Sequence, residues 1–261
     1  MSTASANGID IHYLIEGDGP WLVMSHSLGC DLHMWDEEAR RLSRRYKVLR
    51  YDTRGHGRTS APRGPYSFDM LVDDLQGLLD ALGIASAHFV GLSMGGMIGQ
   101  TYALKYPDTF ASLALCDTSS RYPPEAEAAW LERISTVEQK GMDALVAPTL
   151  ERWFTERSRK ARLPAVEKAA AMIRATPAQG YVGCCHAIPK INVTARLKEI
   201  RSPALVIVGE DDLATPVAMA EEIHRAMPGS SLVVIPQAAH LSNLEQAEAF
   251  NRALERFLAN Q

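Results

Sequence analysis

Short apolar runs of strand length alternate along this chain with longer segments of helical periodicity. The strand-like runs cover residues 21–25, 47–51, 88–91, 113–116, 205–208 and 232–235. Helical patterns cover residues 34–43, 68–82, 94–106, 217–226 and 244–259. Because the strand runs are largely apolar, as in strands buried on both faces, we expect a mostly parallel central sheet with helices on both faces. Residues 9–15 alternate instead, which predicts an antiparallel strand at the start.

The region 119–196 breaks this alternation. It contains helical patterns around residues 126–140, 142–154 and 163–175 and no convincing core strand, and it is punctuated by prolines 123, 124, 148, 164, 177 and 189. Such prolines are typical of a set of short helices. We therefore expect a core of residues 1–118 and 197–261 with a helical lid, residues 119–196, over the carboxyl edge of the sheet. Ligands bind at that edge in open α/β sheets.

Composition and charge favour an ordinary enzyme with a small-molecule substrate. The 261 residues carry 27 Lys and Arg against 31 Asp and Glu, a net charge of -4, with no basic run. This argues against a nucleic-acid or membrane partner. With no bilayer-length apolar stretch and no signal pattern in residues 1–7, we expect a cytoplasmic protein. The four cysteines lack metal-ligand spacing, so no metal is expected. A homo-oligomer stays open.

Candidate chemistry begins with Gly91-Leu92-Ser93-Met94-Gly95-Gly96, which lies between an apolar strand and a helix. This pattern is typical of a nucleophile elbow, in which a sharp turn exposes the serine oxygen. The small residues on either side let the strand and the helix approach closely. Ser93 is therefore the candidate nucleophile, and the amide of Met94 at the helix start faces any negative charge that forms beside it.

A serine nucleophile requires a base and a carboxylate that orients the base. Of the eight histidines, His240 alone follows the last predicted strand. The strand at 205–208 leads into Asp211 and Asp212, and on the residues alone either could be the acid. The chain order Ser, Asp, His is that of the α/β-hydrolases.

A second oxyanion donor is expected in the loop that follows the strand at 21–25. We choose the amide of Leu28, in the sequence Ser25-His26-Ser27-Leu28-Gly29. His26 is interpreted as a residue that fixes the loop through hydrogen bonds rather than as a base. With Met94, Leu28 would complete an oxyanion hole.

These motifs resemble the α/β-hydrolase fold family, from residue 21 almost to the C-terminus. The similar stretches are 26–29 (HSLG), 51–57 (YDTRGHG), 91–96 (GLSMGG), 209–216 (GEDDLATP) and His240. In this family the acid usually stands three residues after the glycine, so the resemblance implies Asp212 rather than Asp211. It also implies catalysis without a cofactor. Ser27 departs from the glycine that many members have at that position.

A narrower resemblance is to the 3-oxoadipate enol-lactonases of aromatic-compound degradation. It rests on 25–29 (SHSLG) with 34–35 (MW), 48–57 (VLRYDTRGHG), 64–66 (GPY), 114–118 (ALCDT) and 152–155 (RWFT). It implies hydrolysis of a small anionic enol-lactone. The substrate carboxylate needs a cation or several donors, and the candidate substrate-binding residues are Arg152, Arg121, Trp153 and His33.

Other activities stay open on the sequence. A broad-range carboxylesterase acting on aryl, aliphatic or polyester substrates is the nearest alternative. Perhydrolase, haloperoxidase-like and carbon–carbon lyase activities can use a similar triad. A dehalogenase is disfavoured because it needs a carboxylate at the elbow, where this chain has Ser93. A hormone receptor of the same fold is the non-enzymatic hypothesis, and turnover of p-nitrophenyl acetate would exclude a pure binder.

Overall fold

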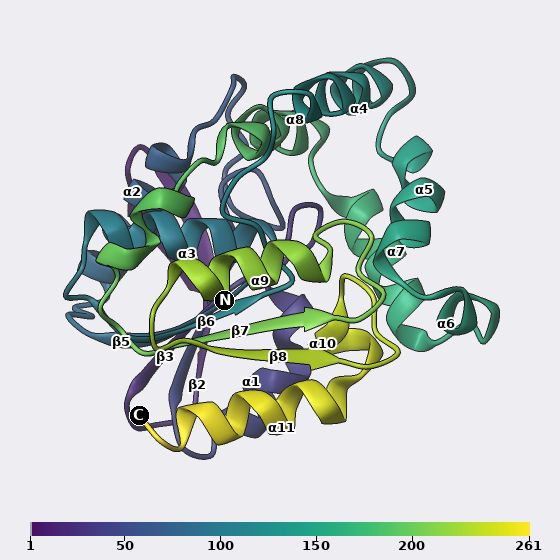
Figure 1. Cartoon of the computed structure of the whole chain (residues 1–261). Coiled ribbons are helices and arrows are strands. Elements are labelled where there is room, and N and C mark those ends of the chain that lie inside the picture. Colours follow the sequence, from purple (N-terminus) through teal and green to yellow (C-terminus); the bar gives the residue numbers. More distant parts are fainter. Residues whose placement is uncertain (1) are drawn as a thin grey trace.

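The computed structural model describes residues 2–261, and across this range eight strands form one sheet (Figure 1). The strand order is β1-β2-β4-β3-β5-β6-β7-β8, in which β1 and β2 are antiparallel and the remaining strands are parallel. The bounds are β1 (Ser2–Ala6), β2 (Ile9–Glu16), β3 (Trp21–Ser25), β4 (Lys47–Tyr51), β5 (Ala87–Leu92), β6 (Phe110–Cys116), β7 (Ala204–Gly209) and β8 (Ser231–Ile235). The expected mostly parallel α/β-hydrolase sheet is confirmed.

The parallel strands end at one edge of the sheet. Ser25 at the end of β3 is in register with Gly91 near the end of β5, and Leu92 is in register with Cys116 at the end of β6. Cys116 is in turn paired with Ile207 of β7. The loops that follow these strands therefore converge, although the first begins after Ser25 and the last after Gly209.

Helices cover both faces of the sheet (Figure 1). The helices α2 (Phe68–Ala81), α3 (Met94–Lys105) and α9 (Val217–Ala226) lie on one face, and α1 (Asp36–Leu42) and α11 (Ala247–Leu258) lie on the other. In α11 the residues Phe250, Leu254 and Leu258 are buried at helical spacing. Two expected helices are divided: a short 3-10 turn, η1 (Leu32–Trp35), precedes α1, and α10 (Ser242–Glu245) precedes α11.

Between β6 and β7 the chain forms a group of helices beyond the carboxyl edge of the sheet (Figure 1). These are α4 (Ala126–Lys140), α5 (Asp143–Trp153), α6 (Glu156–Lys160), α7 (Pro164–Ala175) and α8 (Ala178–Ala187), followed by the 3-10 turns η2 (Ile188–Lys190) and η3 (Thr194–Glu199). The segments that enter and leave the group pair through a bridge between Arg121 and Asn192. Helix α8 packs so closely on the core that a Cβ on Gly180 would overlap the backbone of Gly55.

Candidate active site

Ser93 lies on a sharp turn between β5 and α3. Its backbone has φ 55° and ψ −115°, which is strained for a residue with a side chain and is typical of functional positions. A Cβ on Gly95 would overlap the carbonyl oxygen of Ser25, and a Cβ on Gly91 would overlap the backbone of Gly95. The Thr118 hydroxyl donates to the Ser93 carbonyl at 2.7 Å. The glycine spacing thus has a steric cause, and the segment that follows β6 holds the turn in place.

His240 and Asp212 form a buried hydrogen-bonded pair. The Nδ1 of His240 donates to Oδ2 of Asp212 at 2.9 Å, which leaves Nε2 as the basic nitrogen. The other carboxylate oxygen accepts from the amides of Ala214 and Thr215, at 2.7 and 2.9 Å. Burial alone would raise the pKa of Asp212, but the charge and hydrogen bond of His240 and the Thr215 bonds hold it below its ordinary value. Asp212 is therefore suited to remain ionised, and the exposed Asp211 is not its equivalent.

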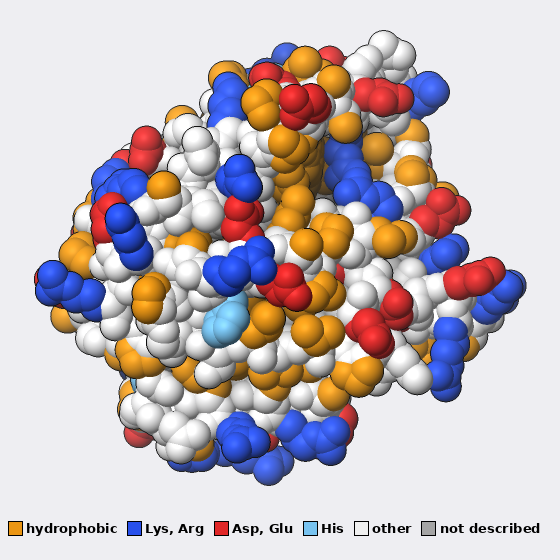
Figure 2. Space-filling model, viewed as in Figure 1, with side chains coloured by type: hydrophobic (Ala, Val, Ile, Leu, Met, Phe, Trp, Pro, Cys, Tyr) orange, Lys and Arg blue, Asp and Glu red, His pale blue; other side chains and the backbone are white. Residues whose placement is uncertain are grey.

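Ser93 and His240 line one small cavity beneath the lid. Its volume is about 30 Å³, room for roughly two water molecules. The lid contributes Tyr122, Trp130, Arg133, Arg152, Trp153 and Ile188 to its wall. Figure 2 shows a hollow lined mainly by apolar side chains between the lid helices and α9, with basic side chains on its wall. A carbonyl carbon placed in this cavity would face the serine and the histidine together.

Two buried histidines hold the loop that follows β3. His26 accepts the Thr53 amide at Nε2, 3.0 Å away, so its Nδ1 carries the proton and donates to the Ser27 carbonyl at 2.8 Å. That carbonyl belongs to the same peptide unit as the Leu28 amide, so His26 also orients the Leu28 N–H. The loop is therefore held at the cavity, which Ser27 and Leu28 line.

His56 holds the same loop from the other side. Its Nε2 accepts the Gly29 amide at 3.0 Å, which engages that donor and leaves Leu28 as the candidate for the oxyanion. Burial lowers the pKa of His56 to about 3, with the neighbouring His26 adding to the effect, and burial also lowers the pKa of His26. Both imidazoles are thus neutral, as acceptors of backbone N–H groups must be.

The basic wall of the cavity consists of Arg152 from α5 and Arg133 from α4, and none of the described residues that line the cavity is acidic. Arg133 donates to the Tyr181 hydroxyl at 3.1 Å and lies over the Trp130 ring. Burial, followed by the charge of Arg133, lowers the pKa of Arg152. The two guanidinium groups therefore repel each other. This arrangement suits an anion.

Trp153 lies at the cavity, with its ring centre 6.0 Å from that of His240. The structure does not bring the other two substrate-binding candidates there. Arg121 turns away from the cavity and pairs with Glu222 of α9 at 2.6 Å, with 57% of its side chain exposed. His33 lies on η1 beside Asp36, 3.0 Å away, and is likewise exposed. Arg133 is a cavity residue that is not among the candidates predicted from the sequence. Its spacing of three from Trp130 places both on one face of a predicted helix, which was the available signal.

A second buried carboxylate joins the segments that carry the triad candidates. Asp117, which follows β6 in a left-handed conformation with φ 43°, accepts from the Gly209 amide at 2.8 Å and from the Ser242 hydroxyl at 2.5 Å. Burial raises the pKa of Asp117 well above its ordinary value, and the nearby charge of Asp212 adds to this. Asp117 thus connects β7, before Asp212, to α10, after His240.

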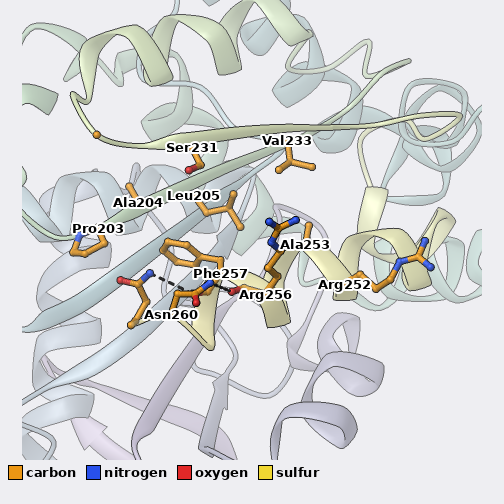
Figure 3. Close-up of a pocket in the computed structure, with 12 residues that line it drawn as sticks. Pro203, Ala204, Leu205, Ser231, Val233, Arg252, Ala253, Arg256, Phe257 and Asn260 are labelled. Carbon is orange, nitrogen blue, oxygen red and sulfur yellow. Dashed lines mark hydrogen bonds between the residues drawn. The ribbon is translucent and has the colours of Figure 1, made fainter.

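A larger hollow of about 860 Å³ lies between α11 and the strands β7 and β8 (Figure 3). Pro203 and Ser231 line it, so it lies at the opposite end of these strands from the triad candidates. Its described lining contains no histidine, cysteine or acidic residue that could act as a nucleophile or base. Size alone therefore does not identify the site.

Within residues 2–261, no cluster of three His, Cys, Asp or Glu side chains is arranged to hold a metal ion. In the same part of the chain, no helix combines the length and apolar character that a membrane span requires.

The sequence and the fold both identify a known family. The family model for the alpha/beta hydrolase fold matches residues 20–247. The chain belongs to this family and is an enzyme of the carboxylic ester hydrolase class.

Within the family, the chain is similar to the enol-lactonases. "3-oxoadipate enol-lactonase 2" of Acinetobacter baylyi is 37% identical over 255 residues, which cover 97% of this chain and 94% of the relative. The crystal structure of the enol-lactonase from Burkholderia xenovorans LB400 has a TM-score of 0.94 at 39% identity, over 99% of this chain and 100% of that one. A hydrolase from Pseudomonas aeruginosa PA01 has a TM-score of 0.94 at 40% identity, over 98% and 97% of the two chains.

Proposed function

We propose that this chain is a serine hydrolase that opens a small, carboxylate-bearing lactone, 3-oxoadipate enol-lactone. Ser93 is the nucleophile, His240 the base and Asp212 the orienting acid. One observation carries the proposal: Ser93 and His240 share a cavity whose described lining includes Arg133 and Arg152 and no acidic residue. The similarity to enol-lactonases supports the same substrate.

The first half of the reaction is acylation. His240 Nε2 removes the proton of the Ser93 hydroxyl while Oγ attacks the lactone carbonyl carbon. The amides of Leu28 and Met94 stabilise the resulting oxyanion, each contributing on the order of 3 kcal/mol. Collapse breaks the ring C–O bond, and His240 returns the proton to the enolate. The enol stays tethered to the acyl group on Ser93 and tautomerises to the ketone.

The second half is deacylation. Water enters the cavity, and His240 removes one of its protons as the oxygen attacks the acyl carbon. The bond to Ser93 Oγ breaks, and His240 returns the proton to the serine. The product is an oxo-dicarboxylic acid. Asp212 stays ionised and stabilises the charged imidazole in both halves.

The substrate carboxylate would lie against Arg152 and Arg133, with the Trp153 indole as a wall. A charge-assisted pair with a guanidinium offsets the cost of removing the carboxylate from water. Because the cavity holds only about 30 Å³, the lid of residues 119–196 must shift its side chains when substrate binds over the core.

The test compares the wild type with S93A, using 3-oxoadipate enol-lactone, p-nitrophenyl acetate and the serine reagent phenylmethylsulfonyl fluoride. We expect turnover of both substrates by the wild type, none by a folded S93A, and a sulfonyl adduct that mass spectrometry maps to Ser93. Activity retained by S93A would refute the nucleophile. Turnover of p-nitrophenyl acetate without lactone turnover would favour the broad-range carboxylesterase.

A further inference from the structure

Glu245, at the end of α10, lies buried where the lid meets the loop that carries His240. Only 8% of its surface is exposed. One carboxylate oxygen accepts from both the amide and the hydroxyl of Thr155, at 2.9 and 2.5 Å. The other accepts from the amide of Ala239 at 2.7 Å. One carboxylate thus bonds to the lid with one oxygen and to the residue before His240 with the other.

A second link connects the lid to the other side of the histidine. The amide of Leu241, directly after His240, donates to the Trp153 carbonyl at 3.2 Å. The Trp153 and His240 rings are also in contact, with their centres 6.0 Å apart. Both chain neighbours of His240 are therefore held by the lid segment 153–155, one directly and one through Glu245.

The same lid segment adjoins the cavity. Arg152 and Trp153 line it, while the Trp153 carbonyl and Thr155 face the His240 loop. Thr155 is also the N-cap of α6, where its side chain accepts the Ser158 amide, so the hydroxyl bonded to Glu245 is itself fixed. Arg152 and Trp153 thus adjoin the substrate space, and Trp153 and Thr155 support the loop of the catalytic histidine.

The chemistry of Glu245 suits a rigid connection. A buried carboxylate is costly unless its oxygens are hydrogen-bonded, and charge-assisted bonds are shorter and stronger than neutral ones. In the described chain no ion pair satisfies Glu245, so its three N–H and O–H donors carry that cost. Both oxygens are engaged by different segments, which a neutral side chain of the same size cannot reproduce.

We propose that Glu245 is a positioning residue that fixes His240 relative to the lid, so that the α5–α6 junction and the catalytic histidine move as one body. This rests on the proposed function, in which His240 is the base. Residues 153–155 then keep their position relative to His240 during turnover.

The experiment measures kcat and KM separately for p-nitrophenyl acetate, a small neutral ester that needs no anion site. In E245Q, the side-chain oxygen can accept from the amide of either Thr155 or Ala239. The NH2 group then faces the backbone N–H of the other residue, and two donors meet. Loss of the His240 geometry should lower kcat by about tenfold to a hundredfold, while KM changes less than about threefold. The matched control is E248Q, because Glu248 is an exposed glutamate on α11 that pairs with Arg41.

A second variant, T155V, removes the hydroxyl that donates to Glu245 and caps α6, and it keeps the amide bond to Glu245. It should lower kcat less than E245Q does, with KM again little changed. If E245Q does not fold, the T155V result decides. Wild-type kcat in folded E245Q, or in T155V, would overturn the proposal, as would an equal loss in E248Q. These outcomes differ from failure of the proposed function, which would appear as activity in S93A.

Discussion

Replacing Arg152 with glutamine separates recognition of the substrate's charge from catalysis. Arg152 lines the cavity but forms no hydrogen bond with the triad candidates, and Trp153 beside it contacts His240 through its ring. The R152Q variant keeps a polar side chain of moderate length and removes one of two positive charges. We expect it to weaken turnover of the anionic lactone and to leave turnover of a neutral ester almost unchanged.

The magnitude follows from the kind of bond that is lost. A hydrogen bond to a charged group contributes about 1.5–3 kcal/mol, and each 1.4 kcal/mol corresponds to a factor of ten. Arg152 is partly exposed, which places the loss at the lower end of that range. Arg133 also remains to attract the carboxylate. We therefore expect kcat/KM for the lactone to fall by about tenfold to thirtyfold.

The same substitution should not destabilise the protein. Burial and the charge of Arg133 lower the pKa of Arg152, so the folded protein disfavours this positive charge. Removing the charge relieves that repulsion. The melting temperature of R152Q should therefore equal or exceed that of the wild type.

The assay measures kcat/KM for 3-oxoadipate enol-lactone and for p-nitrophenyl acetate in the wild type, R152Q and R121Q. R121Q is the matched control, because Arg121 pairs with Glu222 on the surface away from the cavity. An equal loss of kcat/KM on both substrates in R152Q would refute this prediction, since Arg152 would then act in catalysis rather than in recognition of the substrate's charge. An equal loss in R121Q would refute it as well.

Three further substitutions test how the site is built. Because the pKa of Asp117 is raised in the folded chain, the contribution of this group to stability falls as pH rises above about 4, where the unfolded chain ionises freely. The melting temperature of D117N relative to wild type should therefore increase as pH rises from about 4 towards the raised pKa, and a constant difference would contradict this. H56A leaves the buried Gly29 amide without its acceptor, so thermal melting should report a loss of about 1–3 kcal/mol and kinetics a lower kcat; an unaltered kcat would argue against a supporting role for this loop. G95A places a Cβ on a backbone carbonyl oxygen at the elbow and should abolish soluble expression or activity, so a fully active G95A would contradict the steric account.

The core of the fold was readable from the sequence because its central strands are buried on both faces. Their apolar runs lie at the predicted positions, within a few residues. β1 was missed because Ser2–Ala6 is polar and small, and it joins the sheet edge through backbone pairing with β2. Helix α8 was missed because its glycines and cysteines give no amphipathic pattern, and its position depends on contact with Gly55.

The candidate site was readable where local geometry dictates the residue type. The elbow at Ser93 requires small neighbours, and that requirement is visible as glycines. The roles of Asp117 and Glu245 depend on which loops converge in space, and no sequence spacing encodes that convergence. The place of Arg121 on the surface and of Arg152 at the cavity depend likewise on how the lid folds. The cytoplasmic location and a homo-oligomer stay predictions.

The ratio of kcat/KM for 3-oxoadipate enol-lactone to that for p-nitrophenyl acetate, measured on the wild type, tests the central claim most directly. A cavity in which Ser93 and His240 lie beside two arginines, with no acidic residue in its described lining, should favour the anionic lactone by about a hundredfold or more, as two charge-assisted contacts would give. The preference should fall with added salt, which screens the partly exposed arginines. A ratio near one, or in favour of the neutral ester, would contradict the claim.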